Sequence, residues 1–195
     1  MVSGRLSSGS TVAQSWRVTA EPQPNPRLPL DEEGLERLGL SYAGRYATTR
    51  AKLEAYLRRK VRERGWAGAG PPPVERMVGR FAALGYVDDR AFAAAKASSL
   101  LRRGYGERRV RDALQAAGIA EEDAADARDE AGAQAFGAAL RFAERRGLGP
   151  YAATVPDRPA REKAAAAMLR AGHRADLVRR ILAAPPGEVP DPDSF

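Results

Sequence analysis

Apolar residues recur with helical spacing along most of this chain. Positions i, i+3, i+4 and i+7 share one face of an α-helix, and the first such set is Val74, Met77, Val78 and Phe81. Three later segments repeat the spacing: Val110, Ala113, Leu114 and Ala117; Phe136, Ala139, Leu140 and Ala143; and Ala164, Ala167, Met168 and Ala171. No comparable alternation of period two indicates strands. We therefore predict an all-α fold.

A glycine followed by a larger residue ends three of the predicted helices, as is typical of helix C-termini. The three pairs, whose glycines lie 53 and 54 residues apart, are Gly65-Trp66, Gly118-Ile119 and Gly172-His173. Apolar or alanine residues precede the last two glycines by eight, four and one positions, whereas Arg64 directly precedes the first. We expect a longer helix before each glycine and a shorter one after it, at Val74 to Leu84, Glu121 to about Arg128, and Ala175 to Leu182.

This period predicts three consecutive three-helix units. Units of this size bury their apolar faces poorly alone, so neighbouring units should share contacts. The alternative is chance spacing in a chain rich in alanine and glycine. We place the units at residues 31–86, 87–130 and 131–184. Closely spaced prolines predict a disordered arm over residues 1–30, and residues 185–195 should form a short acidic tail.

The charge of the chain favours polyanionic partners. The net charge is +7, and arginine supplies 28 of the 32 basic residues. Guanidinium groups bind phosphate or carboxylate in two places and stack on bases, although a GC-rich genome would also enrich arginine. The first basic block comprises Arg45, Arg50, Lys52, Arg58, Arg59, Lys60, Arg62 and Arg64. The second comprises Arg102, Arg103, Arg108, Arg109 and Arg111, with Tyr105 between them.

Each basic block is open to two interpretations. It is either a surface for phosphate or an acidic partner, with Tyr105 available to stack, or an ordinary solvated helix face. Residues 119–130 differ, because they hold six acidic residues and one arginine. Neither block indicates sequence-specific recognition of bases, since the predicted helix from Glu107 to Ala117 offers only Gln115 for base edges.

The residues that carry chemistry give no indication of an enzyme. The chain has no cysteine and a single histidine, His173, which excludes thiolate sites and leaves no metal cluster. Asp88 and Asp89 could bind a metal, but capping of the following helix is the plainer interpretation. No segment is long and apolar enough to span a bilayer. We expect no cofactor, no metal, no membrane association and a cytoplasmic location.

Three segments resemble the RecX family of regulators of the RecA recombinase, especially its alphaproteobacterial members. Residues 46–66 resemble the first-repeat motif, and residues 103–119 resemble the second repeat. Residues 81–92 resemble the linking motif of the family, whose matching positions are Gly85, Tyr86, Asp88, Asp89 and Phe92. The likeness covers roughly residues 42–183. Lys52 departs from the glutamate common in the family, which leaves Thr49 to cap its helix alone, and the third unit has an extended connection.

The resemblance implies an elongated, curved tandem of three-helix repeats without a catalytic site. It also implies a modulator, negative in sign, that lies in the groove of the RecA filament on single-stranded DNA and restrains filament growth, ATPase activity and strand exchange. Such a protein would act in DNA repair, homologous recombination and the SOS response. We expect a monomer with weak, non-specific affinity for single strands, its basic blocks facing DNA phosphate or acidic RecA surface. The alternatives are a helix-turn-helix-like transcriptional regulator and a scaffold for another acidic protein.

Overall fold

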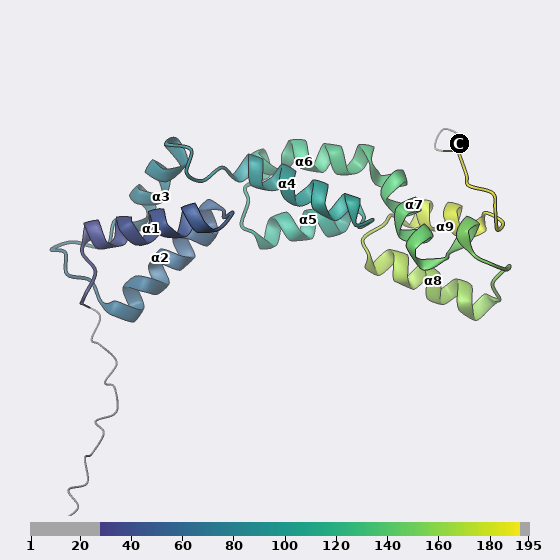
Figure 1. The fold of residues 1–195 in the computed structure, drawn as a ribbon, viewed down its shortest axis with the longest axis horizontal. Coiled ribbons are helices and arrows are strands. Elements are labelled where there is room, and N and C mark those ends of the chain that lie inside the picture. Colours follow the sequence, from purple (N-terminus) through teal and green to yellow (C-terminus); the bar gives the residue numbers. More distant parts are fainter. Residues whose placement is uncertain (1–27, 192–195) are drawn as a thin grey trace, which may run out of the picture.

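The computed structural model describes residues 28–191, which form a row of helices and no strand (Figure 1). The helices are α1 (Glu32–Arg45), α2 (Arg50–Arg64), α3 (Val74–Ala83), α4 (Asp89–Arg102), α5 (Glu107–Ala116), α6 (Glu121–Ala133), α7 (Ala135–Arg146), the 3-10 turn η1 (Gly149–Tyr151), α8 (Arg158–Arg170) and α9 (Ala175–Ala183). The predicted all-α class and the elongated, curved arrangement are confirmed. We refer to α1–α3, α4–α6 and α7–α9 as the first, second and third units.

Each unit packs around apolar side chains of its own. The largest fully buried side chains in each cluster are Leu30, Leu35, Leu53, Leu57 and Phe81 in the first unit, Leu101, Val110 and Leu114 in the second, and Met168 and Ile181 in the third. Alanines fill most of the remaining core positions in the second and third units. Because alanine buries little area, the second and third units on their own have thin cores that depend on their neighbours.

The repeated glycines lie where the sequence places them. Gly65, Gly118 and Gly172 have φ angles of 82°, 70° and 94°, a left-handed region that glycine enters without a steric penalty. The expected lengths of the flanking helices are correct in the first and third units and wrong in the second, where α5 has 10 residues and α6 has 13. The reason is that buried alanines at Ala124, Ala127 and Ala131 continue the apolar face of α6.

The start of the described chain belongs to the first unit. Leu30 is only 1% exposed, its N–H donates to the carbonyl of Gly65 (3.0 Å), and its own carbonyl accepts from the N–H of Ala67 (2.9 Å). The expected disordered arm therefore does not extend to residue 30. Its residues 1–27 lie outside the described part of the chain, as do residues 192–195 of the expected tail. Within residues 28–191, no helix combines the length and apolar character needed to cross a bilayer.

Candidate protein and nucleic-acid interface

The start of α2 joins the first unit to the second. Thr49 caps α2, because its Oγ1 accepts a hydrogen bond from the N–H of Lys52 (3.2 Å). The same hydroxyl donates to the carbonyl of Ala117 in the second unit (2.7 Å). A Cβ added to Gly118 would lie 2.4 Å from the Cβ of Ala51, so the two backbones approach as closely as glycine allows.

Asp89 connects the same two units through a buried carboxylate. Asp88 caps α4 by accepting from the N–H of Ala91 (2.8 Å), in agreement with the capping interpretation. Asp89 is instead 5% exposed and accepts from the backbone N–H (2.8 Å) and the Nε (3.2 Å) of Arg50. The hydrogen bond that Arg50 donates to Asp89 raises the pKa of Arg50, which also pairs with Asp123. Arg50, expected in the binding surface, is thus occupied at this junction.

The second and third units meet in an equivalent way. The N–H of Gly106, which precedes α5, donates to the carbonyl of Ala171 (3.0 Å), and the N–H of Arg108 donates to that of Gly172 (3.2 Å). Ala117 and Ala171 hold the same place in the repeat, directly before its glycine. The carbonyl of Ala117 accepts from Thr49, the N-cap of α2, and the carbonyl of Ala171 accepts from Gly106, the N-cap of α5. The regular spacing of the glycines therefore reflects a backbone contact that recurs between neighbouring units.

His173 lies inside the second junction. It is 4% exposed, and its Nε2 lies 3.1 Å from the carbonyl oxygen of Gly104. Its ring meets that of Phe142 edge-on, with the centroids 5.4 Å apart. Burial lowers the pKa of His173 to about 4, so the ring is neutral at neutral pH and contributes packing and one hydrogen bond.

Much of the charge in the first basic block is balanced by neighbouring acids. Arg58 pairs with Glu54 (2.8 Å) and Glu75 (2.6 Å). In the same block, Arg59 and Lys60 form ion pairs with Glu63. The guanidinium of Arg64 donates hydrogen bonds to the carbonyl of Leu28. Among the described residues, no carboxylate lies within ion-pair distance of Arg45, Lys52, Arg62 or Arg64. The block is therefore less cationic than its composition indicates.

The second basic block retains its charge. Within the described part of the chain, none of its five arginines lies within ion-pair distance of a carboxylate. The guanidinium of Arg103 lies 5.2 Å from the ring centroid of Tyr105, and that of Arg109 lies 5.9 Å from it. Arg102 donates to Ser98 (2.6 Å), and Arg108 donates to the carbonyl of Leu169 in the third unit. Two cations of the block, Arg103 and Arg109, therefore lie beside a half-buried aromatic ring.

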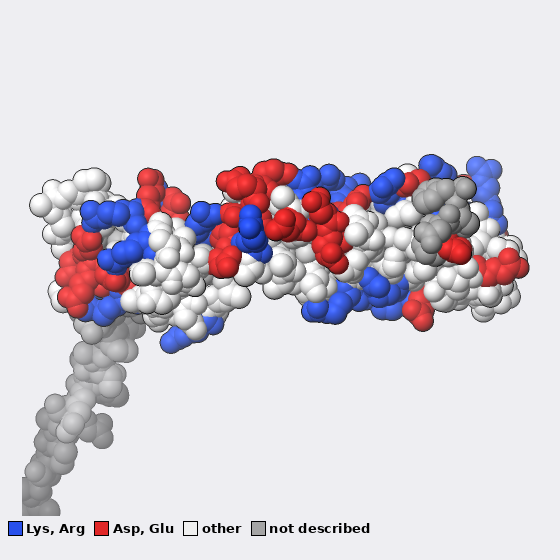
Figure 2. Space-filling model, turned by 90° about the horizontal axis from the view of Figure 1, so that it is seen from above, with Lys and Arg blue, Asp and Glu red and all other residues white. Residues whose placement is uncertain are grey.

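Acidic side chains mark a different surface of the second unit. In the face shown in Figure 2, they gather over the middle of the molecule, with basic side chains at both of its edges. Helix α6 of this unit carries six acidic residues: Glu121, Glu122, Asp123, Asp126, Asp129 and Glu130. The separation gives the second unit one cationic and one anionic surface.

A shallow groove lies between the first and second units. Its volume is about 580 Å³, and its lining includes Tyr46, Tyr86, Phe92 and Lys96. Tyr46 and Tyr86 are each 54% exposed, although both are large aromatic residues. Gly85, at φ 75°, turns the chain after α3 and so places Tyr86 beside the groove. The sequence indicated Gly85, Tyr86 and Phe92 only as parts of a structural motif, and it did not indicate the groove.

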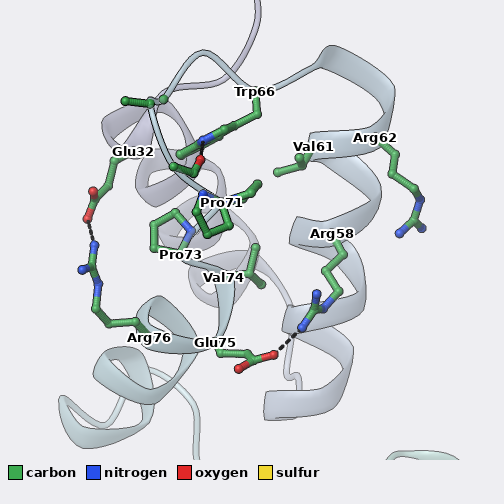
Figure 3. Close-up of a pocket in the computed structure, with 14 residues that line it drawn as sticks. Glu32, Arg58, Val61, Arg62, Trp66, Pro71, Pro73, Val74, Glu75 and Arg76 are labelled. Atoms are coloured by element: carbon green, nitrogen blue, oxygen red, sulfur yellow. Dashed lines mark hydrogen bonds and ion pairs between the residues drawn. The ribbon is translucent and has the colours of Figure 1, made fainter.

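A second groove, of about 920 Å³, lies at the outer end of the first unit (Figure 3). Trp66 covers one side and donates from its indole N–H to the carbonyl of Gly70 (2.7 Å). Ion pairs close the other sides, between Arg76 and Glu32 (2.7 Å) and between Arg58 and Glu75. The groove brings together no nucleophile and base. Among residues 28–191, no group of three histidine or acidic side chains could hold a metal ion.

These features define a class of helical-repeat proteins that present a cationic surface and no visible catalytic constellation in the described residues. A family model described as RecX, second three-helix domain, matches residues 88–127. The regulatory protein RecX of Myxococcus xanthus is 31% identical over 76% of this chain and 83% of its own length, and that of Agrobacterium fabrum is 30% identical over 73% and 78%. The chain belongs to the RecX family of regulatory proteins.

Other relatives agree with this assignment. The RecX protein of Deinococcus radiodurans is 38% identical over 112 residues, and this chain spans about half (52%) of its length. The crystal structure of RecX from Lactobacillus salivarius superposes with a TM-score of 0.62 over 78% of this chain and 94% of that one, at 17% sequence identity. At that identity the likeness concerns the fold alone.

Proposed function

We propose that this protein is a negative modulator of the RecA recombinase that binds the RecA filament on single-stranded DNA. The family assignment supports a regulatory rather than a catalytic role. The row of three units offers a long, rigid surface, which suits a partner that is itself a filament. On this proposal the protein acts as a monomer inside the cell and has only weak, sequence-independent affinity for single strands.

The second basic block is the observation that carries the proposal. None of its arginines has a carboxylate partner among the described residues, and Arg103 and Arg109 lie beside the ring of Tyr105, so their charge is available to phosphate or to an acidic protein surface. The first block contributes less, because half of its eight charged groups already form ion pairs with carboxylates. We therefore assign the principal contact to the second unit.

The experiment measures ATP hydrolysis and strand exchange by RecA on single-stranded DNA, with this protein added below and at equimolar ratio. We expect both activities to fall. Arg103→Glu with Arg109→Glu should remove most of the effect. The matched control is Arg158→Glu with Arg161→Glu, on the exposed start of α8 outside both blocks. Unchanged RecA activities with the wild-type protein would reject the proposal, and equal loss in the two double variants would reject the role of the second block.

A further inference from the structure

The groove between the first and second units has the composition of a site for flat aromatic ligands. Tyr46, Tyr86 and Phe92 line it, and small residues such as Ala47 and Ala91 leave room between the rings. Exposed aromatic rings of this size are unusual in a chain whose cores bury their largest side chains. An aromatic ring with an exposed face is the surface on which nucleobases stack.

Cations accompany the aromatic rings along one path. The Nζ of Lys52 lies 4.7 Å from the ring centroid of Phe92. Lys96 lines this groove and also the neighbouring hollow, of about 330 Å³, that contains Tyr105 and Arg103. The path therefore runs from the aromatic groove along α4 to the second basic block.

The acidic residues near this path do not cancel its charge. Asp88 lines the groove, but its carboxylate accepts from a backbone N–H at the start of α4, where the helix dipole favours a negative group. Asp112 borders the hollow around Tyr105, where Lys96, Arg103 and Arg109 outnumber it. The combination of rings and net positive charge matches a single-stranded nucleic acid better than an acidic peptide, which offers no series of flat rings.

The polar lining adds one group that lacks a partner. Thr48 is 7% exposed and borders the groove, and its Oγ1 has no hydrogen-bond partner among the described residues. A buried hydroxyl without a partner costs free energy. A ligand that carries hydrogen-bonding edges as well as a flat face would relieve this cost, and nucleobases have both.

We propose that this groove is a stacking site for unpaired nucleobases of a single strand whose phosphates lie along the second basic block. The inference rests on the proposed function and names the part of the strand that the first two units hold. Phe92 and Arg103 are eleven residues apart along α4, or about 16 Å. At the rise of about 3.4 Å per nucleotide of stacked duplex DNA, roughly five nucleotides cover that distance, and a more extended single strand covers it with fewer.

The test compares two oligonucleotides with the same phosphates, one of thymidines and one of abasic residues, by fluorescence anisotropy without RecA. A length of about 15 nucleotides exceeds the span of the site. We expect the thymidine strand to bind at least about 5-fold more tightly than the abasic one, the lower bound for one stacked base. Tyr86→Ala should lower this preference markedly and leave abasic binding unchanged, whereas Tyr86→Phe should retain it.

The controls separate stacking from folding and from regulation. Leu84→Ala changes an equally exposed residue that does not line the groove, and it should leave the preference intact. Tyr46→Ala provides a second variant if Tyr86→Ala lowers the helical content or the melting temperature. Equal binding of both strands by the wild type, or equal weakening of both by Tyr86→Ala, overturns the inference. So does a Tyr86→Ala variant that loses RecA inhibition while keeping its full preference for thymidines, since the groove would then hold protein. If the wild-type protein fails to inhibit RecA but keeps its preference for thymidines, only the proposed function is overturned.

Discussion

The pair of Arg50 and Asp89 should stabilise the junction between the first two units more than any surface ion pair. Asp89 is almost fully buried and accepts from the backbone N–H and from the Nε of Arg50, so Arg50→Ala leaves the buried carboxylate without its side-chain donor and Asp89→Asn removes its charge. Hydrogen bonds to charged groups contribute about 1.5–3 kcal/mol. Because Arg50 is 44% exposed, solvent screening reduces this figure. We expect a coupling free energy of about 1–2 kcal/mol.

A double-mutant cycle measures this coupling. The free energy of unfolding is determined by urea titration, followed by circular dichroism, for Arg50→Ala, Asp89→Asn and the double variant. The matched pair is Arg58 with Glu54, which lies on the same helix but in solvent. Its expected coupling is about 0.3–0.5 kcal/mol. Equal couplings for the two pairs would refute the argument that Asp89 holds the units together.

Three further predictions concern the junctions and the basic surface. Gly172→Ala should destabilise the fold by several kcal/mol in thermal unfolding, because its Cβ would lie 2.5 Å from the backbone nitrogen of Arg109. The control is Gly187→Ala, which has a similar φ but open space around it and should cost only about 1–2 kcal/mol. Since burial lowers the pKa of His173 from 6.5 to about 4, the neutral ring stabilises the fold above pH 6.5. About 2 kcal/mol of the free energy of unfolding is therefore lost when the pH falls from 7 to 5. His173→Gln should remove this loss in urea titrations, and a ring pKa near 6.5 by NMR would contradict the prediction. Arg103→Glu with Arg109→Glu should make the salt dependence of single-strand binding clearly shallower, and an unchanged slope would exclude phosphate contacts there.

The helices were readable from sequence because two local signals coincide. Val74, Met77, Val78 and Phe81 are all buried, as their spacing predicts. Glycine at the turns is required by backbone geometry, which depends on local sequence. The length of α6 was misjudged because its buried positions are alanines, whose apolar signal is weak next to the acidic residues on the same helix.

The site was less predictable because it depends on partners that are distant in sequence. Arg50 and Arg103 are alike as single residues. Only the fold shows that Arg50 meets Asp89, 39 positions away, while Arg103 meets an aromatic ring and no acid. Asp88 and Asp89 are likewise adjacent in sequence but differ in role, because one faces its own helix and the other faces the neighbouring unit.

Co-sedimentation with RecA filaments tests the central claim most directly, since it reports binding without reference to any activity. The protein should pellet with RecA assembled on single-stranded DNA in the presence of ATP. The Arg103→Glu and Arg109→Glu double variant should remain largely in the supernatant at the same salt concentration. The account would be contradicted if the wild-type protein also stayed in the supernatant, or if it pelleted equally with DNA alone.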